Sequence, residues 1–260
     1  MTNAMLDGAN GGAKGVEDAR AAAFAKARAE VDVYYERADL SGDPDGGLAV
    51  NRGARCYNRA MELQSFDDYE ERVAMFQAAE YLYRIGQEKG NLWGFVDAGY
   101  IYYYDRCEGR YYPDFREQPY SADAQKYCDT FDLDQHAYEC FLQGAEAGEP
   151  QSCYKVGDLL KHGRGCVKDP EGAFRMYERA YVRGLKDNEV CWGGAALRLG
   201  DCCERGFGTE QDFARALEWY ERAEVGLGIA VEAGDWFFER SLAGAQAGVK
   251  RCRQELDGGY

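Results

Sequence analysis

The chain has 260 residues, and 46% of them are hydrophobic, which supplies enough apolar surface for a folded core. It carries 31 Lys plus Arg against 46 Asp plus Glu, so its net charge is −15. A field of that sign repels phosphate backbones and anionic lipid surfaces, which excludes nucleic acid as a partner and favours a neutral or basic protein.

The N-terminal segment, residues 1–14, is rich in Gly, Asn and Ala, and we expect a disordered tail there. It has no basic region followed by an apolar run, so no secretory signal is visible. No stretch of the chain approaches the roughly 18 apolar residues of a membrane span. We therefore expect a cytoplasmic protein without a membrane span.

Three helices are predicted before the first clear repeat. Residues 15–40 are Ala-rich with apolar side chains near helical spacing, and a turn rich in Gly and Asp at 41–47 ends that helix. A second helix is expected over 48–64 and a third from residue 67 or 68 to 89. We assign residues 15–66 to N-terminal helices, 67–240 to helical repeats and 241–260 to a capping helix and tail.

A Tyr- and Arg-rich insertion interrupts the repeats at about residues 105–130. Tyr and Arg are the residue types that dominate hot spots of protein interfaces, so this segment is a candidate partner-binding surface. The alternative is that the insertion folds back and covers the flank of the repeats. The candidate binding residues are Tyr103, Arg106, Arg110, Tyr111, Tyr112, Phe115, Arg116 and Tyr120.

The chain repeats itself most clearly after residue 150. A shift by 43 places residues 153–180 on 196–223 without a gap, with ten identities in 28 positions. Offsets of 58 and 36 extend the pattern to earlier copies, so the basic unit has about 36 residues with loops of unequal length. Each unit is expected to contain a helix A, a loop with glycines and a helix B.

Cap and turn residues recur inside these units. Asp169 and Asp212 each precede a predicted helix B and can accept hydrogen bonds from its free N–H groups. Gly163 can take the left-handed conformation that ends a helix A. Gly157 and Gly200 lie within predicted helices, where each costs about 1 kcal/mol relative to Ala. We interpret them as points where helix backbones approach closely.

The best two copies run from Val156-Gly157-Asp158 to Ala180 and from Leu199-Gly200-Asp201 to Ala223, each with a Gly-x-Gly loop, an Asp and a Tyr-x-x-Ala segment. This pattern resembles the Sel1-like repeat family. In the copy at Gly99, Asp105 stands where the loop glycine belongs. The resemblance implies an all-α fold, a right-handed α-α superhelix related to tetratricopeptide arrays, that acts as a protein-binding scaffold. In bacterial members such proteins often support signalling or envelope assemblies.

The ten cysteines form no Cys-x-x-Cys pair, and His136 and His162 are the only histidines, so we expect no metal site and no cofactor. Cys166 lies four residues after His162, a spacing that we interpret as coincidental. A cysteine-rich branch of the resembled family carries disulfides within its repeats and is linked to β-lactam binding or hydrolysis. This chain lacks a regular cysteine pair in each unit, and we expect no Ser-x-x-Lys nucleophile.

The sequence therefore predicts a non-enzymatic scaffold, without catalytic residues, that holds a peptide or protein on the concave face of the solenoid and through the Tyr/Arg-rich insertion. The alternative from another class is a cysteine-rich Sel1-repeat hydrolase or β-lactam-binding protein. A count of free thiols separates the two, because ten free thiols would remove the disulfide-bearing alternative.

Overall fold

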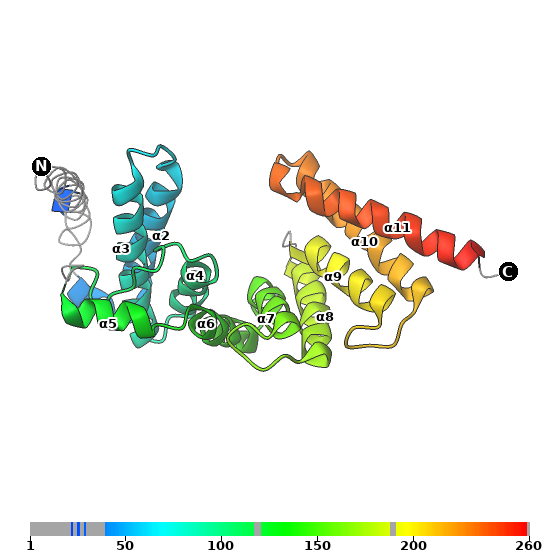
Figure 1. Cartoon of the computed structure of the whole chain (residues 1–260), viewed down its shortest axis with the longest axis horizontal. Coiled ribbons are helices and arrows are strands. Elements are labelled where there is room, and N and C mark those ends of the chain that lie inside the picture. Colours follow the sequence, from blue (N-terminus) through cyan, green and yellow to red (C-terminus); the bar gives the residue numbers. More distant parts are fainter. Residues whose placement is uncertain are drawn as a thin grey trace, which may run out of the picture. The chain divides into compact units, whose positions relative to one another are not determined.

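The computed structural model describes residues 40–116, 121–187 and 191–258, together with positions 22, 25, 26 and 29. The expected tail, most of the expected helix over 15–40, and Tyr120 lie outside the described residues. The chain divides into two compact units, Met1–Leu133 and Asp134–Tyr260, which we describe separately (Figure 1). Within the described part every regular element is a helix, and none is long and apolar enough to cross a membrane.

The first unit is built around one central helix, α3, which packs against both α2 and α4. The helices expected over 48–64 and from 67 or 68 to 89 are confirmed as α2 and α3. The start of α2 is held by the buried Asp43, whose carboxylate accepts the N–H groups of Leu48 and Ala49 at 3.0 Å each. The described elements of this unit are η1 (Leu40–Gly42), α2 (Gly47–Glu62), α3 (Tyr69–Glu88), α4 (Leu92–Tyr103) and α5 (Ala122–Thr130).

The second unit is a stack of helical pairs in two layers. Helix α8 packs against both α7 and α9, and α10 packs against both α9 and α11. Helices α7, α9 and α11 also contact one another in sequence and form what we call the A-helix layer, with α8 and α10 as the B-helix layer. The elements are α6 (Leu133–Ala147), α7 (Pro150–His162), α8 (Pro170–Asp187), α9 (Cys191–Arg205), α10 (Phe213–Glu232), η2 (Trp236–Phe238) and α11 (Glu239–Gly258).

Helices α7 and α9 each contact the B helix that follows through a tyrosine ring packed on a glycine. A Cβ added at Gly157 would lie 2.6 Å from Cε1 of Tyr177, and one at Gly200 would lie 2.7 Å from Cδ1 of Tyr220. Both tyrosines are buried. These glycines therefore make room for an aromatic ring, which corrects the interpretation that they let two helix backbones approach.

The loops and caps of the two best copies form as the sequence predicts. Asp169 accepts the N–H of Gly172 at 2.8 Å and Asp212 accepts that of Arg215 at 2.9 Å, so both begin a B helix. Gly163 ends α7 with φ +69°. These features, with the paired layers, confirm the expected all-α solenoid fold class.

The second glycine of each Gly-x-Gly loop touches the previous B helix. A Cβ at Gly165 would lie 2.0 Å from the backbone of Asp134, and one at Gly208 would lie 2.0 Å from the carbonyl oxygen of Pro170. Asp134 and Pro170 lie at the beginnings of α6 and α8. Successive repeats are therefore held in register by a backbone contact that leaves no space for any side chain.

Candidate functional site

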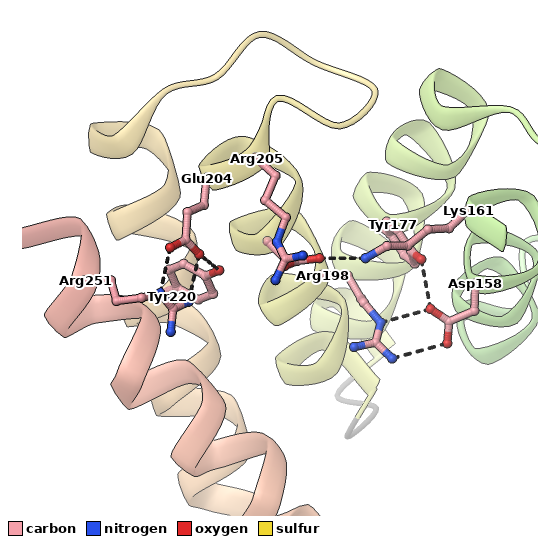
Figure 2. Close-up of polar contacts among 9 residues, drawn as sticks. Asp158, Lys161, Tyr177, Arg198, Glu204, Arg205, Tyr220 and Arg251 are labelled. Carbon is pink, nitrogen blue, oxygen red and sulfur yellow. Dashed lines mark hydrogen bonds and ion pairs between the residues drawn. The ribbon is translucent and has the colours of Figure 1, made fainter. Parts of the chain in front are cut away.

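Charged side chains of the A-helix layer form a row of ion pairs that crosses from helix to helix, and two tyrosines of the B helices donate hydrogen bonds to its acids (Figure 2). Each acid in the row is bound by a base on another helix of the layer. We call this row the polar ladder, and it consists of Asp158, Lys161, Tyr177, Arg198, Asp201, Glu204, Arg205, Tyr220 and Arg251.

The first rung joins α7 to α9. The carboxylate of Asp158 accepts a hydrogen bond from the hydroxyl of Tyr177 at 2.8 Å and another from Nε of Arg198 at 2.9 Å (Figure 2). Asp158 is buried in the protein, so this charge depends on its two partners for solvation. The rung therefore fixes the guanidinium of Arg198 on the surface of the layer.

The second rung also joins α7 to α9, and one carboxylate serves two bases. Nζ of Lys161 lies 2.6 Å from Oδ2 of Asp201, and Nε of Arg205 lies 2.7 Å from Oδ1 of the same carboxylate. Lys161 stands one helical turn after Asp158, so the two rungs lie side by side along α7. The side chain of Arg205 is 70% exposed, which makes it the member most available to a partner.

The third rung joins α9 to α11. Glu204 accepts the hydroxyl of Tyr220 at 2.5 Å, and Nε and Nη2 of Arg251 donate to its two oxygens at 2.7 and 2.8 Å (Figure 2). The hydrogen bonds from Arg251 hold the pKa of the Glu204 carboxyl below its usual value. Burial and the neighbouring carboxylate raise the pKa of Tyr220. Glu204 is therefore an anion and Tyr220 a neutral donor at neutral pH.

Of the candidate residues in the insertion, three are buried in the first unit. Tyr111 stacks on Phe131 with ring centroids 4.7 Å apart, and Phe115 packs on Tyr81 at 5.3 Å. Tyr112 is also buried, and its carbonyl oxygen accepts a hydrogen bond from Arg84 Nη2 at 2.9 Å. These three side chains hold the insertion against the helices, as the covering alternative requires.

The remaining candidates reach the surface to different extents. Arg110 pairs with Glu70 at 2.8 Å and Arg116 pairs with Asp114 at 2.6 Å. Tyr103 is half-buried and meets the ring of its neighbour Tyr104 edge to face. Arg106 is half-buried and lies over aromatic rings. Among the described candidates, the accessible surface therefore belongs mainly to these four half-buried side chains.

The comparison with known families agrees with this architecture. The sequence model of the Sel1 repeat matches residues 132–149, 150–184 and 194–224. Residues 132–224 of the chain therefore contain Sel1 repeats. The matched segments contain every residue of the polar ladder except Arg251, which lies on α11.

Two solved structures resemble the Sel1-repeat chain. One is c5321, a protective antigen of uropathogenic Escherichia coli with an SLR fold, at 20% identity and a TM-score of 0.38. That match covers 82% of this chain and 46% of c5321, so the chain spans about half the length of that protein. The other is a Sel1 repeat protein from Oxalobacter formigenes, at 18% identity and a TM-score of 0.34, covering 82% and 96% of the two chains.

No disulfide joins the cysteines of the Sel1-repeat chain, which all lie in its described part, and most of them are buried. Burial raises the pKa of Cys202 to about 12 and that of Cys203 to about 11. Burial, with a contribution from Asp134, also raises the pKa of Cys166, which lies near His162 in sequence. A nucleophilic cysteine needs a lowered pKa, so these thiols have the opposite chemistry.

One Ser-x-x-Lys sequence, Ser152 to Lys155, does occur at the start of α7, which corrects the expectation of none. Ser152 is completely buried, and its Oγ has no hydrogen-bond partner among the described residues. Lys155 is buried as well. A serine that neither contacts a base nor reaches solvent is part of the helix core. The described residues also contain no cluster of His, Cys, Asp and Glu that could hold a metal ion.

The polar ladder was not predicted from the sequence. The repeated Gly-Asp pair marks Asp158 and Asp201, but these two aspartates have different partners. Tyr177 bonds to Asp158, whereas Tyr220 bonds to Glu204, one helical turn after Asp201. One feature of the sequence could have predicted these hydrogen bonds. Each repeat has an acid on helix A and the tyrosine of the Tyr-x-x-Ala segment on helix B.

Proposed function

We propose that this Sel1-repeat protein is a non-enzymatic scaffold that binds a peptide or protein on the A-helix layer of its second unit, the face expected to be concave. The polar ladder is the observation that carries the proposal. Its ion pairs hold the exposed Arg205 and Arg251 in place before a partner arrives, so binding costs less side-chain entropy. Sel1 repeats typically mediate protein interactions, which agrees with this use of the layer.

The partner class follows from charge and from the surface that remains accessible. The net charge of −15 favours a partner that is neutral or basic over most of its length. The accessible ends of Tyr103 and Arg106 in the first unit provide a second contact region in this proposal. Ten cysteines without a disulfide suit a reducing compartment, so we propose that the scaffold works in the cytoplasm.

The proposal is tested by a matched pair of charge reversals. Arg205→Glu places an acid on the A-helix layer, beside Asp201. Arg222→Glu makes the same change on α10, where Arg222 also pairs with an acid one turn earlier, Glu218. Both proteins are used to capture partners from a lysate of the native organism, and bound chains are identified by mass spectrometry.

We expect a specific partner to be retained by the wild type and by Arg222→Glu and to be lost by at least tenfold with Arg205→Glu, since charge reversal in an interface typically exceeds 1.4 kcal/mol. Circular dichroism confirms that both variants are folded. Equal retention by both variants would exclude the A-helix layer as the binding surface. The hydrolase or β-lactam-binding alternative fits poorly, because its candidate nucleophiles are thiols that are buried or half-buried and a serine that is completely buried.

A further inference from the structure

The first unit contains a surface pocket that the polar ladder does not include. It has a volume of about 540 Å³ and lies between the end of α2, the side of α3 and the residues that follow α4. One wall is apolar and includes Met61, Leu63 and Phe76. Arg106 and Glu108 also line the pocket, and the guanidinium of Arg106 lies next to the ring of Phe76. Pockets of this size commonly hold small ligands or side chains of a peptide.

Arg106 is a cation without a counter-ion in the described part of the chain. Its guanidinium carbon lies 4.9 Å from the ring centroid of Tyr104, 5.7 Å from that of Phe76 and 6.0 Å from that of Tyr57. Nε of Arg106 is buried and has no hydrogen-bond partner there. A buried donor without an acceptor is unfavourable, and this one belongs to a side chain that lines a pocket.

The other charged groups of the pocket are already engaged. Arg72 donates to the carbonyl oxygen of Leu63 and lies 3.6 Å from Glu108. Glu108 also accepts the hydroxyl of Tyr69 at 2.6 Å. Asp105 accepts the hydroxyl of Tyr111 at 2.9 Å. Arg106 is therefore the charged lining residue whose hydrogen-bonding capacity is unused.

The backbone around Arg106 is held in an unusual conformation. Asp105 and Glu108 have φ angles of +46° and +51°, in the left-handed region that residues other than glycine seldom adopt. The repeat pattern places a glycine where Asp105 stands, and the matching Gly163 has φ +69°. Asp105 adopts the same left-handed conformation as that glycine. Its carboxylate also accepts the hydroxyl of Tyr111, and this hydrogen bond holds the backbone on one side of Arg106.

We propose that this pocket binds a carboxylate of a peptide, with Arg106 as the donor and the apolar wall of Met61, Leu63 and Phe76 receiving a neighbouring apolar side chain. The inference rests on the proposed scaffold function and names a ligand chemistry for its second contact region. Glu108 and Asp105 also line the pocket and repel a doubly charged phosphate more strongly than a singly charged carboxylate. Met61 and Tyr104 are 43% and 47% exposed, so the rim is open and a peptide can continue beyond it.

The test uses three capped dipeptides. Acetyl-Leu-Leu with a free C-terminus offers a terminal carboxylate, acetyl-Leu-Asp-amide offers a side-chain carboxylate, and acetyl-Leu-Asn-amide has the same shape as the second without the charge. Binding is followed by nuclear magnetic resonance at the Arg106 guanidinium in the wild type and at the backbone amides of the pocket residues in every variant. Inorganic phosphate is titrated as a fourth probe.

We expect saturable shifts of the Arg106 signal with at least one carboxylate and none with the asparagine peptide, and the stronger of the two carboxylates identifies the source. Arg106→Gln is expected to weaken carboxylate binding at least tenfold, whereas Arg175→Gln on α8, an exposed site in the second unit, leaves it unchanged. Met61→Glu at the rim is expected to weaken it too, through repulsion, while leaving the guanidinium in place.

Equal shifts with the aspartate and asparagine peptides would overturn the proposal, as would tighter binding of phosphate than of either carboxylate, or no shift at all. These outcomes are distinguishable from a failure of the scaffold function. Partner capture that depends on Arg205 would continue to support the scaffold even if no dipeptide shifts the Arg106 signal. Thermal unfolding of Arg106→Gln and Met61→Glu checks that a loss of binding is not a loss of fold.

Discussion

At the scale of single residues, the contact that defines this chain is a tyrosine ring on a helical glycine. It occurs at Gly157 with Tyr177 and at Gly200 with Tyr220 in the Sel1 repeats. Glycine within a helix costs about 1 kcal/mol relative to Ala, and here the buried ring area offsets that cost. The contact decides how close an A helix and a B helix lie.

Gly157→Ala is expected to destabilise the protein although alanine favours helices. The new Cβ would lie 2.6 Å from the ring of Tyr177, and relieving such overpacking costs about 1–3 kcal/mol. Gly228→Ala on α10 is the control, because a Cβ there meets nothing within 4 Å and the change stabilises by up to about 1 kcal/mol. Urea unfolding measures both, and a stabilised Gly157→Ala would show that the ring moves aside freely.

Glu204 gives the third rung a defined pH dependence. Because hydrogen bonds from Arg251 lower the pKa of Glu204 in the folded state, its contribution is present above the ordinary value of 4.5 and is lost as pH falls through the folded value. Glu204→Gln is expected to cost about 1 kcal/mol at pH 7, a value that allows for the half-exposed Arg251. The cost shrinks when the pH falls well below 4.5.

The measurement is the free energy of unfolding of wild type and Glu204→Gln at pH 7 and at acid pH. Glu218→Gln serves as the control, since Glu218 forms an exposed pair with Arg222 at 3.6 Å. A difference between wild type and Glu204→Gln that is the same at both pH values would contradict the assigned role of the charge.

At the scale of elements, the insertion is a cover over the first unit. Gln77 on α3 donates to the carbonyl oxygen of Arg110 at 2.9 Å, and Arg84 on α3 donates to that of Pro113 at 2.7 Å. Tyr111 fills the space between the insertion and Tyr102 of α4. The segment that looks most like an interface by composition is therefore largely an internal surface, and its aromatic residues serve packing.

Tyr111→Ala is expected to cost about 3–5 kcal/mol, because it removes a large buried ring and leaves a cavity. Hydrogen exchange of α3 is expected to rise, since the cover that shields it loosens. Tyr104→Ala removes the same side chain from an exposed site and is expected to cost less than about 1 kcal/mol. Similar exchange of α3 in both variants would mean that Tyr111 does not hold the cover in place.

The sequence predicts the elements well wherever the spacing between residues repeats. The caps at Asp169 and Asp212 and the loop glycine at Gly163 follow from local chemistry and are confirmed. The pair α2–α3 makes the same contact of a tyrosine ring with a glycine, because a Cβ at Gly53 would lie 2.6 Å from the ring of Tyr83. The repeat pattern in the sequence does not reveal this pair. That glycine and tyrosine are 30 residues apart, against 20 in the Sel1 repeats, so no fixed offset aligns them.

At the scale of the whole molecule, the polar ladder and the pocket are harder to predict than the repeats, because they depend on contacts between helices that are far apart in the sequence. Arg198 lies 40 residues after Asp158, and Arg251 lies 47 residues after Glu204. Neither interval equals the 43-residue shift between the two best copies, so aligning the copies does not pair these residues. The pocket at Arg106 depends on residues from α2, α3 and the turn after α4, which no linear pattern brings together.

The backbone contact of Gly165 and Gly208 with the preceding B helices has a consequence for how such a chain grows. Because this part of the joint between repeats needs only main-chain atoms and a glycine, a duplicated segment brings the contact with it. Its surface is then free to diverge while the joint stays intact. An engineer could lengthen this protein in the same way, by copying one full period and preserving a single glycine.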